Sequence, residues 1–238
     1  MKVTLINYTQ NAARLLAFTK RTRLGLNAQT ISQVNMMSEE ELAEELKYIS
    51  NTIKSSWEFV HYTWLIQDVS RAFTHQFVRS RTGSFAQQSM RVTDQGSYEY
   101  IPTARNYKCE VASIIIDNHT EYTQKCYNEL IAAGQPPEDA RGVLPTNIST
   151  NIVASFNLRS FADLVQKRSG GRTQNEYRDV VDWMAQCVLN VHPWSKDFLY
   201  PEGRDYFKEI EDFADREFAD DIMKKGELLK IVDKMRGQ

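Results

Sequence analysis

The chain has 238 residues, of which 29 are basic and 31 acidic, so its formal net charge at pH 7 is −2. Such a balance argues against a protein that recruits long nucleic acid or an anionic membrane through its overall field, so any anion site must be local. Three widely spaced cysteines argue against a disulfide framework or a structural zinc site. No apolar run approaches about 20 residues and the start lacks a signal-peptide pattern. We therefore expect a cytoplasmic protein without a metal site.

Hydrophobic periodicity predicts a mixture of strands and helices. Apolar residues at every second position indicate a strand, and apolar residues three and four apart indicate a helix. The predicted elements, in chain order, are a strand at 3–9, helices at 11–20 and 38–53, a strand at 57–70, helices at 70–78, 110–133 and 136–145, a strand at 146–160, helices at 159–168 and 175–191, and a charged helical segment at 204–235. No repeat or flexible linker interrupts them. We expect a single α+β domain over residues 1–238.

Two of these helices carry specific local signals. Ser38 is followed three residues later by Glu41, a capping-box pattern that predicts where the helix at 38–53 begins. The helix at 70–78 is expected to face Phe73, Phe77 and Val78 inward. A loop is expected to follow this helix, near residue 83.

The segment 74–91 carries the main chemical signal, because three arginines lie there among glutamines and serines. Arginine forks bind phosphate and carboxylate groups through paired hydrogen bonds and stay charged at any working pH. Arg79 and Arg81 are expected to leave the end of the helix together, while Ser89 and Arg91 point to one side of an extended piece. The alternative is that these arginines are ordinary surface ion-pair partners.

A second polar cluster lies at 157–177, around a predicted strand-to-helix junction and a Gly-Gly break. Its members are Asn157, Arg159, Arg168, Arg172, Gln174 and Glu176. An amide and a guanidinium at such a junction are suited to holding a flat ligand. The alternative is an exposed amphipathic helix that buries only its apolar stripe. Walker, dinucleotide-binding, zinc-protease and serine-nucleophile motifs are absent from the sequence.

Through these two polar segments and further matches along its length, the whole chain resembles the flavin-dependent thymidylate synthases. The hallmark of that family is an Arg-His-Arg step followed by a serine, an acid or amide, and Ser-x-Arg. The matching residues here are Arg79-Ser80-Arg81, Ser84, Gln87 and Ser89-Met90-Arg91, supported in the same order by Trp57-Glu58, Gln76, SYEYIP at 97–102, ARGVLP at 140–145, NLRS at 157–160 and HPW at 192–194. The chain departs from the pattern at Ser80 for the central histidine, Gln87 for a frequent glutamate, Val92 for an aromatic residue, and TKRTR at 19–23 for a small-residue stretch.

The resemblance implies an α+β fold with a central, mostly antiparallel sheet flanked by helices, and a homotetramer whose active sites are shared between subunits. It implies conversion of dUMP to dTMP, with methylenetetrahydrofolate as carbon donor and FAD, reduced by NADPH, as hydride carrier. In such chemistry the cofactors carry the reaction while protein groups orient the rings and stabilise charge.

The resemblance also implies roles for individual residues. The implied catalytic residues are Arg79, which would polarise the pyrimidine carbonyl, and Arg168 near the uracil. The implied dUMP-binding residues are Gln76, Arg79, Gln87, Ser89, Arg91, Arg141 and Arg168. The implied FAD-binding residues are Ser55, Glu58, Arg79, Ser80, Arg81, Asn157, Arg159 and Arg172.

Two alternatives follow from the change at Ser80, because serine has neither the flat ring nor the titratable proton of histidine. A relative with the same fold could hydroxymethylate a pyrimidine nucleotide instead of methylating it. Alternatively, the chain could bind nucleotide or flavin without catalysis. The sequence leaves the choice between uracil and cytosine open.

Overall fold

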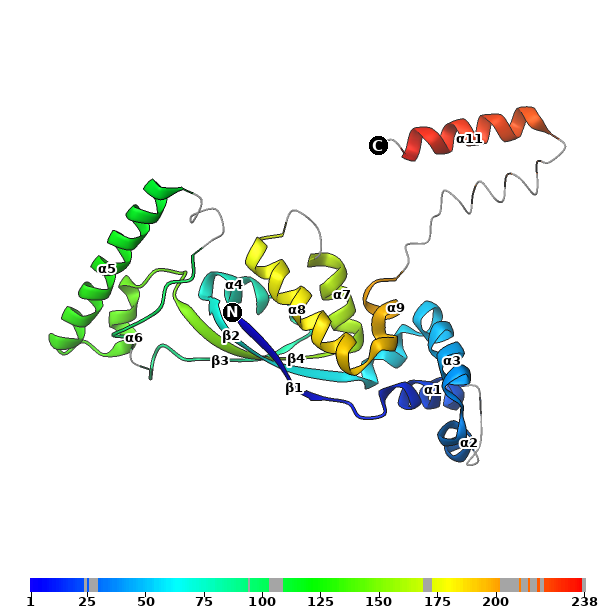
Figure 1. The fold of residues 1–238 in the computed structure, drawn as a ribbon, viewed down its shortest axis with the longest axis horizontal. Helices are drawn as coiled ribbons and strands as arrows, with labels where there is room; N and C mark the ends of the chain where they lie inside the picture. The colour runs from blue at the N-terminus through cyan, green and yellow to red at the C-terminus, as the bar shows by residue number, and fades with distance from the viewer. Residues whose placement is uncertain are drawn as a thin grey trace. The chain divides into compact units, whose positions relative to one another are not determined.

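The computed structural model describes residues 1–23, 25, 30–93, 95–102, 109–168, 173–201, 210, 214, 218 and 221–236. The chain divides into two compact units, Met1–Tyr200 and Pro201–Gln238. The first unit contains the sheet and the predicted site residues, and the second contains helix α11 (Ile222–Arg236). Each unit is described by itself (Figure 1).

The first unit is built on a four-stranded sheet in which every neighbouring pair is antiparallel. Its strands, in spatial order, are β1 (Lys2–Tyr8), β2 (His61–Ser70), β4 (Ser149–Asn157) and β3 (Ser84–Gln87). Alternate residues of β2 and β4 are buried, among them Trp64 and Phe156, as expected for strands with one face against a core. The prediction of an α+β fold with an antiparallel sheet is confirmed.

The helices lie mostly on one face of the sheet and at its two ends (Figure 1). Their bounds are α1 (Ala12–Arg23), α2 (Thr30–Met36), α3 (Glu39–Thr52), η1 (Lys54–Phe59), α4 (Arg71–Phe77), α5 (Glu110–Ala132), α6 (Pro137–Ala140), η3 (Arg141–Val143), α7 (Leu158–Arg168), α8 (Asn175–Val191), η4 (Pro193–Ser195) and α9 (Lys196–Leu199). Helices α4, α7 and α8 pack on the sheet and close the main core. None of the described helices is long and apolar enough to cross a membrane.

The capping box predicted for α3 is present. Ser38 Oγ accepts a hydrogen bond from the backbone N–H of Glu41 at 3.2 Å, and the Glu41 carboxylate accepts one from the N–H of Ser38 at 2.8 Å. Two backbone donors at the start of the helix are thereby satisfied.

Several local predictions are wrong. Residues 57–59, expected to begin a strand, belong instead to the 3₁₀ helix Lys54–Phe59, and buried Trp57 donates its indole N–H to the carbonyl of Ile49 at 3.2 Å. Strand β3 was expected to be loop; pairing with β4 forms it. Val78 is 39% exposed because α4 ends before it, whereas Phe73 and Phe77 are buried as predicted.

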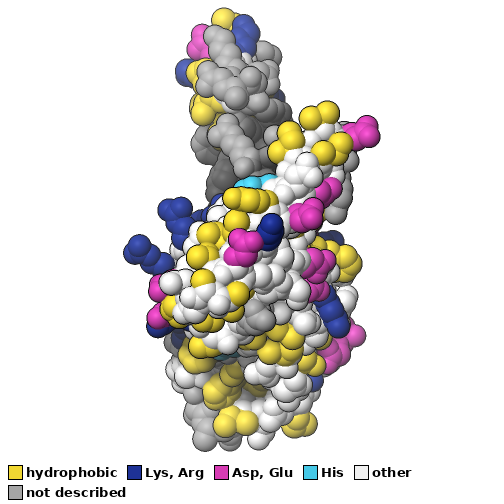
Figure 2. Space-filling model, turned by 90° about the vertical axis from the view of Figure 1, so that its left-hand side faces the viewer, with side chains coloured by type: hydrophobic (Ala, Val, Ile, Leu, Met, Phe, Trp, Pro, Cys, Tyr) yellow, Lys and Arg dark blue, Asp and Glu magenta, His cyan; other side chains and the backbone are white. Residues whose placement is uncertain are grey.

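Helix α5 exposes unusually many apolar side chains. Within its 23 residues, only Thr123 and Tyr127 are buried. The exposed apolar residues, which we call the α5 face, are Val111, Ile114, Ile115 and Tyr122. Hydrophobic side chains are visible at the surface on this side of the molecule (Figure 2). A large exposed apolar surface on a helix is typical of an interaction site.

His192 is a buried titratable residue of the core. It is 7% exposed, and its Nδ1 lies 2.8 Å from the Tyr62 hydroxyl. The rings of Tyr8, Tyr62 and Trp194 surround it. Burial lowers the pKa of His192 below its ordinary value of 6.5, because the charged form loses hydration.

The free energy of unfolding is therefore expected to fall as the pH drops below about 6.5. In that range the unfolded chain binds a proton that folded His192 resists, and the slope reaches at most about 1.4 kcal/mol per pH unit. Urea unfolding at a series of pH values measures it. The His192→Gln variant, whatever its overall stability, should lose this part of the pH dependence. Identical pH profiles for the two proteins would rule His192 out as the source.

Candidate active site

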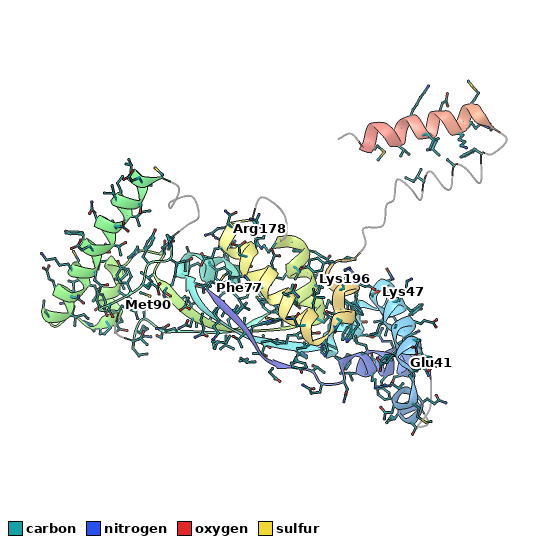
Figure 3. The ribbon with its side chains drawn as sticks, viewed as in Figure 1. Glu41, Lys47, Phe77, Met90, Arg178 and Lys196 are labelled. Atoms are coloured by element: carbon teal, nitrogen blue, oxygen red, sulfur yellow. The ribbon has the colours of Figure 1, made fainter. Side chains whose placement is uncertain are left out.

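Helix α4 carries the arginine motif at its C-terminal end and is fixed at both ends. Ser70 caps it by accepting from the N–H of Phe73 at 3.0 Å. The Glu176 carboxylate on α8 accepts from both the N–H and the hydroxyl of Ser70, each at 2.6 Å. Phe77, labelled in Figure 3, lies in the core between the sheet and α8. The position of the motif is thus set by packing and by charge-assisted bonds.

The turn that follows α4 contains the motif residues Arg79, Ser80 and Arg81. Gly83 closes this turn by donating its N–H to the carbonyl of Ser80 at 3.0 Å. A Cβ atom at position 83 would lie 2.5 Å from the ring of Phe156, so only glycine fits here. Arg79 and Arg81 are both exposed, and neither guanidinium group makes a hydrogen bond or ion pair with the described part of the chain.

Arg71, at the start of α4, is a candidate site residue that the sequence analysis missed. Its Nη2 donates to the carbonyl of Gln88 at 2.6 Å, while its buried Nε has no hydrogen-bond partner among the described residues. Burial and, to a smaller extent, the charge of Arg141 lower the pKa of Arg71. Arg71 also lies in the first helical turn, where the helix dipole disfavours a cation. That position is the sequence signal by which Arg71 could have been found.

Arg91 and Arg141 meet at Glu138 on α6. Arg91 Nε and Nη2 lie 2.8 and 2.7 Å from Glu138 Oε2, and Arg141 Nε donates to the Glu138 carbonyl at 3.0 Å. Together with Arg71 these residues form what we call the Arg71 cluster: Arg71, Arg91, Glu138 and Arg141. The fork of Arg91 is 64% exposed, so the ion pair is open to solvent. Three guanidinium groups with a single carboxylate leave an excess of positive charge suited to an anion.

The expected extended piece at Ser89 and Arg91 is not present. Residues 90–92 form a turn in which the N–H and the hydroxyl of Thr93 both donate to the carbonyl of Ser89. Ser89 Oγ accepts from the N–H of Arg91 at 3.2 Å. The two residues remain adjacent, but local hydrogen bonds hold them in a turn, as serine side chains often do.

The predicted glutamines make side-chain hydrogen bonds on either side of α4. Gln87 donates to the Thr74 hydroxyl at 2.8 Å. Gln76 donates to Gln174, at the start of α8, at 2.5 Å. One hydrogen bond thus orients each of these two side-chain amides, and each amide keeps further donor and acceptor positions for a ligand.

Ser80 and Arg168 are brought together by Tyr177 of α8. The Ser80 and Tyr177 hydroxyl oxygens lie 3.4 Å apart, and the guanidinium carbon of Arg168 lies 4.7 Å from the centroid of the Tyr177 ring. We call these three residues the Tyr177 cluster. Ser80 and Arg168 are among the site residues predicted from the sequence, whereas Tyr177 is not.

Most of the remaining predicted flavin residues lie at the opposite end of α7. Asn157 ends β4 and accepts from the N–H of Ser160 at 2.8 Å, and Arg159 lies 2.6 Å from exposed Glu58. Ser55 accepts from Arg23 at 2.7 Å. The predicted FAD contact Arg172 lies outside the described residues.

The predicted site residues thus form separate groups within one chain. Arg159 and Arg168 are nine residues apart on α7, which corresponds to about 14 Å along the helix axis. The Arg71 and Tyr177 clusters lie toward opposite ends of α4, whose seven residues span about 10 Å. Among the described residues, no group of histidine, cysteine and acidic side chains could hold a metal ion.

Comparison with known proteins identifies the family. Residues 4–194 match the family model described as thymidylate synthase complementing protein. Flavin-dependent thymidylate synthase from Sulfurisphaera tokodaii is 30% identical over 193 residues, covering 81% of this chain and 75% of that protein. The Clostridium tetani enzyme of the same name is 29% identical over 212 residues, covering 81% and 84%, and the Pyrococcus furiosus enzyme is 31% identical over 186 residues, covering 76% and 75%. The chain therefore belongs to the flavin-dependent thymidylate synthase family.

Proposed function

We propose that this protein is a flavin-dependent thymidylate synthase that transfers a one-carbon unit to C5 of dUMP and yields dTMP. Beyond family membership, the observation that carries the proposal is the half-buried guanidinium of Arg71 beside Arg141, whose buried Nε has no hydrogen-bond partner among the described residues. A buried donor without a partner is costly, so such a group is expected to meet an anion in the working protein. The phosphate of a nucleotide monophosphate fits this requirement.

The Arg71 cluster is the proposed phosphate end of the nucleotide site. Arg91 would exchange part of its contact with Glu138 for the phosphate, and Ser89 would add a hydroxyl donor. Gln76 and Gln87 would use their remaining amide atoms for sugar or base. Arg79 and Arg168 are the proposed catalytic residues. A guanidinium next to a pyrimidine carbonyl stabilises the negative charge that its oxygen shares with C5 when C5 acts as the nucleophile.

The residues proposed for the flavin fit a cofactor with anionic and polar groups. Arg79 and Arg81 offer exposed guanidinium groups that are not neutralised within the described chain, and Ser80 adds a hydroxyl. The other proposed FAD contacts are Ser55, Glu58, Asn157, Arg159 and Arg172. The bound flavin would supply the hydride, whereas these side chains bind and orient it. FAD as the specific flavin, NADPH as its reductant, methylenetetrahydrofolate as carbon donor and a cytoplasmic location remain predictions.

We propose that the active enzyme is a homotetramer with active sites shared between subunits. Two features of the chain support this assembly. Arg159, proposed for the flavin, and Arg168, proposed for the nucleotide, lie at the two ends of α7, about 14 Å apart along the helix, so the proposed ligand contacts of one chain form separate groups. The α5 face also leaves Ile114 and Ile115 53% and 62% exposed, which suits contact with another subunit.

The decisive experiment is product analysis by mass spectrometry. The purified protein, loaded with FAD, is incubated with dUMP, NADPH and methylenetetrahydrofolate. We expect dTMP, and none when methylenetetrahydrofolate is omitted. A hydroxymethylated nucleotide would show the hydroxymethylase alternative instead. The absence of any product, with dUMP and FAD both bound, would indicate a non-catalytic relative.

A further inference from the structure

Tyr177 occupies a position between the two halves of the proposed site. It lies in the first turn of α8 and is fully buried. Its ring meets Phe73 and Phe77 of α4 edge to face, at centroid distances of 5.2 and 5.9 Å. The Arg168 guanidinium lies over the ring, and its hydroxyl faces Ser80. It is therefore in contact with a residue proposed for the pyrimidine and a residue proposed for the flavin.

We propose that Tyr177 is a positioning residue. It orients Arg168 toward the nucleotide and fixes the position of Arg168 relative to Ser80, in the turn that follows α4. The inference rests on the proposed function and adds a residue and a role to it. A guanidinium stacked over an aromatic face is held by cation–π attraction and loses much of its freedom to rotate. Arg168 is the last residue of α7, where a long side chain would otherwise adopt many rotamers.

Several contacts hold the start of α8, which carries Tyr177, against α4. The residue just before it, Glu176, is bonded to the N-cap of α4 at two points, and Gln174 is bonded to Gln76 of α4. These polar contacts and the Phe73 and Phe77 rings hold the start of α8 against α4. A side chain that is locked by such surroundings can hold a neighbouring functional group within narrow limits.

The contact with Ser80 gives a physical account of the departure from the Arg-His-Arg pattern. A buried tyrosine hydroxyl needs a polar partner, and Ser80 supplies a hydroxyl at 3.4 Å. An imidazole at position 80 would reach farther from the backbone than the serine hydroxyl does and would meet Tyr177. The small, polar side chain of Ser80 thus fits the space and the hydrogen-bonding need of the Tyr177 hydroxyl. The distance is long for a hydrogen bond between oxygens, so the ring contributes more than the hydroxyl.

The test compares Tyr177→Leu with Tyr177→Phe in the FAD-loaded protein by calorimetry with dUMP. We expect dUMP to bind about 10-fold more weakly to the leucine variant, which lacks the aromatic face. We expect Tyr177→Phe to stay within about twofold of wild type, because the ring under Arg168 remains. If the leucine variant does not fold, Tyr177→Met fills similar space without an aromatic face and serves in its place.

Two controls separate positioning from simple core packing. Tyr62 is also fully buried with its hydroxyl facing one side-chain partner, so Tyr62→Leu should lower the melting temperature but leave dUMP affinity within about twofold. In an Arg168→Ala background, Tyr177→Leu should weaken dUMP binding no further, because the group it positions is gone.

Wild-type affinity in Tyr177→Leu, or an additional loss in the Arg168→Ala background, would overturn the positioning role while leaving the proposed function intact. Failure of the FAD-loaded wild type to bind dUMP would instead overturn the proposed function, and the role of Tyr177 with it. The wild-type measurement thus distinguishes the two failures.

Discussion

Replacing Arg71 with alanine is expected to weaken dUMP binding by about 10- to 100-fold, because a charge-assisted contact to the phosphate contributes about 1.5–3 kcal/mol. The effect should be large since Arg71 is partly desolvated and its buried Nε has no partner among the described residues. Exposed Arg91 must first leave Glu138, so we expect a smaller loss for Arg91→Ala. Calorimetry with dUMP measures both. Affinity for FAD should change little.

The matched control is Arg14→Ala. Arg14 is partly buried and, like Arg71, donates to backbone carbonyls, those of Val34 and Met37 at 2.8 and 3.2 Å. Its loss should lower stability without weakening dUMP binding. Arg71→Lys keeps the positive charge but loses the paired guanidinium donors, so its affinity for dUMP should lie between those of Arg71→Ala and wild type. Unchanged dUMP affinity in Arg71→Ala would remove this residue from the phosphate site.

Placing charges on the α5 face is expected to dissociate the enzyme and remove most of its activity. In the double variant Ile114→Asp and Ile115→Asp, two carboxylates would have to be buried in the proposed subunit contact, which is strongly unfavourable. Light scattering measures the assembly, and dTMP formation measures the activity. The folded chain itself should persist, because both side chains are more than half exposed.

The control for this variant is Met36→Asp. Met36 is 84% exposed on α2, so the substitution adds charge at an apolar surface position outside the α5 face. It should change neither assembly nor activity. An active monomer of the double variant would contradict the shared-site proposal, and an unaltered tetramer would move the subunit contact away from α5.

The elements that could be predicted from the sequence are those specified by local interactions. Ser38 and Glu41 specify the start of α3 through hydrogen bonds three residues apart. Helix α8 has the predicted bounds because its buried residues recur at helical spacing. The end of α4 before the motif was predicted for a similar reason, since Phe73 and Phe77 define its buried stripe.

The elements that could not be predicted depend on distant parts of the chain. Strand β3 has four residues with no continuous apolar face, and it exists through pairing with β4, about 70 positions later. The aromatic residues around Trp57 suggested a strand, but packing of that ring beside α3 gives a 3₁₀ helix.

The same limit applies to the candidate site. The resemblance to the family supplied Arg79 and Arg168 as residues but not their neighbours. Tyr177 lies 97 positions from Ser80, and no spacing rule relates the two. Arg71 stands outside the quoted motif. Its place in the first turn of a predicted helix is the signal that the sequence offers, whereas its burial and the nearby Arg141 are known only from the structure.

The close approach of Gly83 to Phe156 also limits how the motif turn can evolve. Thr82 and Ser84, on either side, are exposed and can accept other side chains, whereas any Cβ at 83 would collide with an aromatic ring of the central sheet. Sequence changes in this turn are therefore restricted to substitutions of its other residues, because an insertion or deletion would move Gly83 away from the Phe156 ring. Single substitutions at the flanking positions can thus change the side chains of the turn, while the backbone path stays the same.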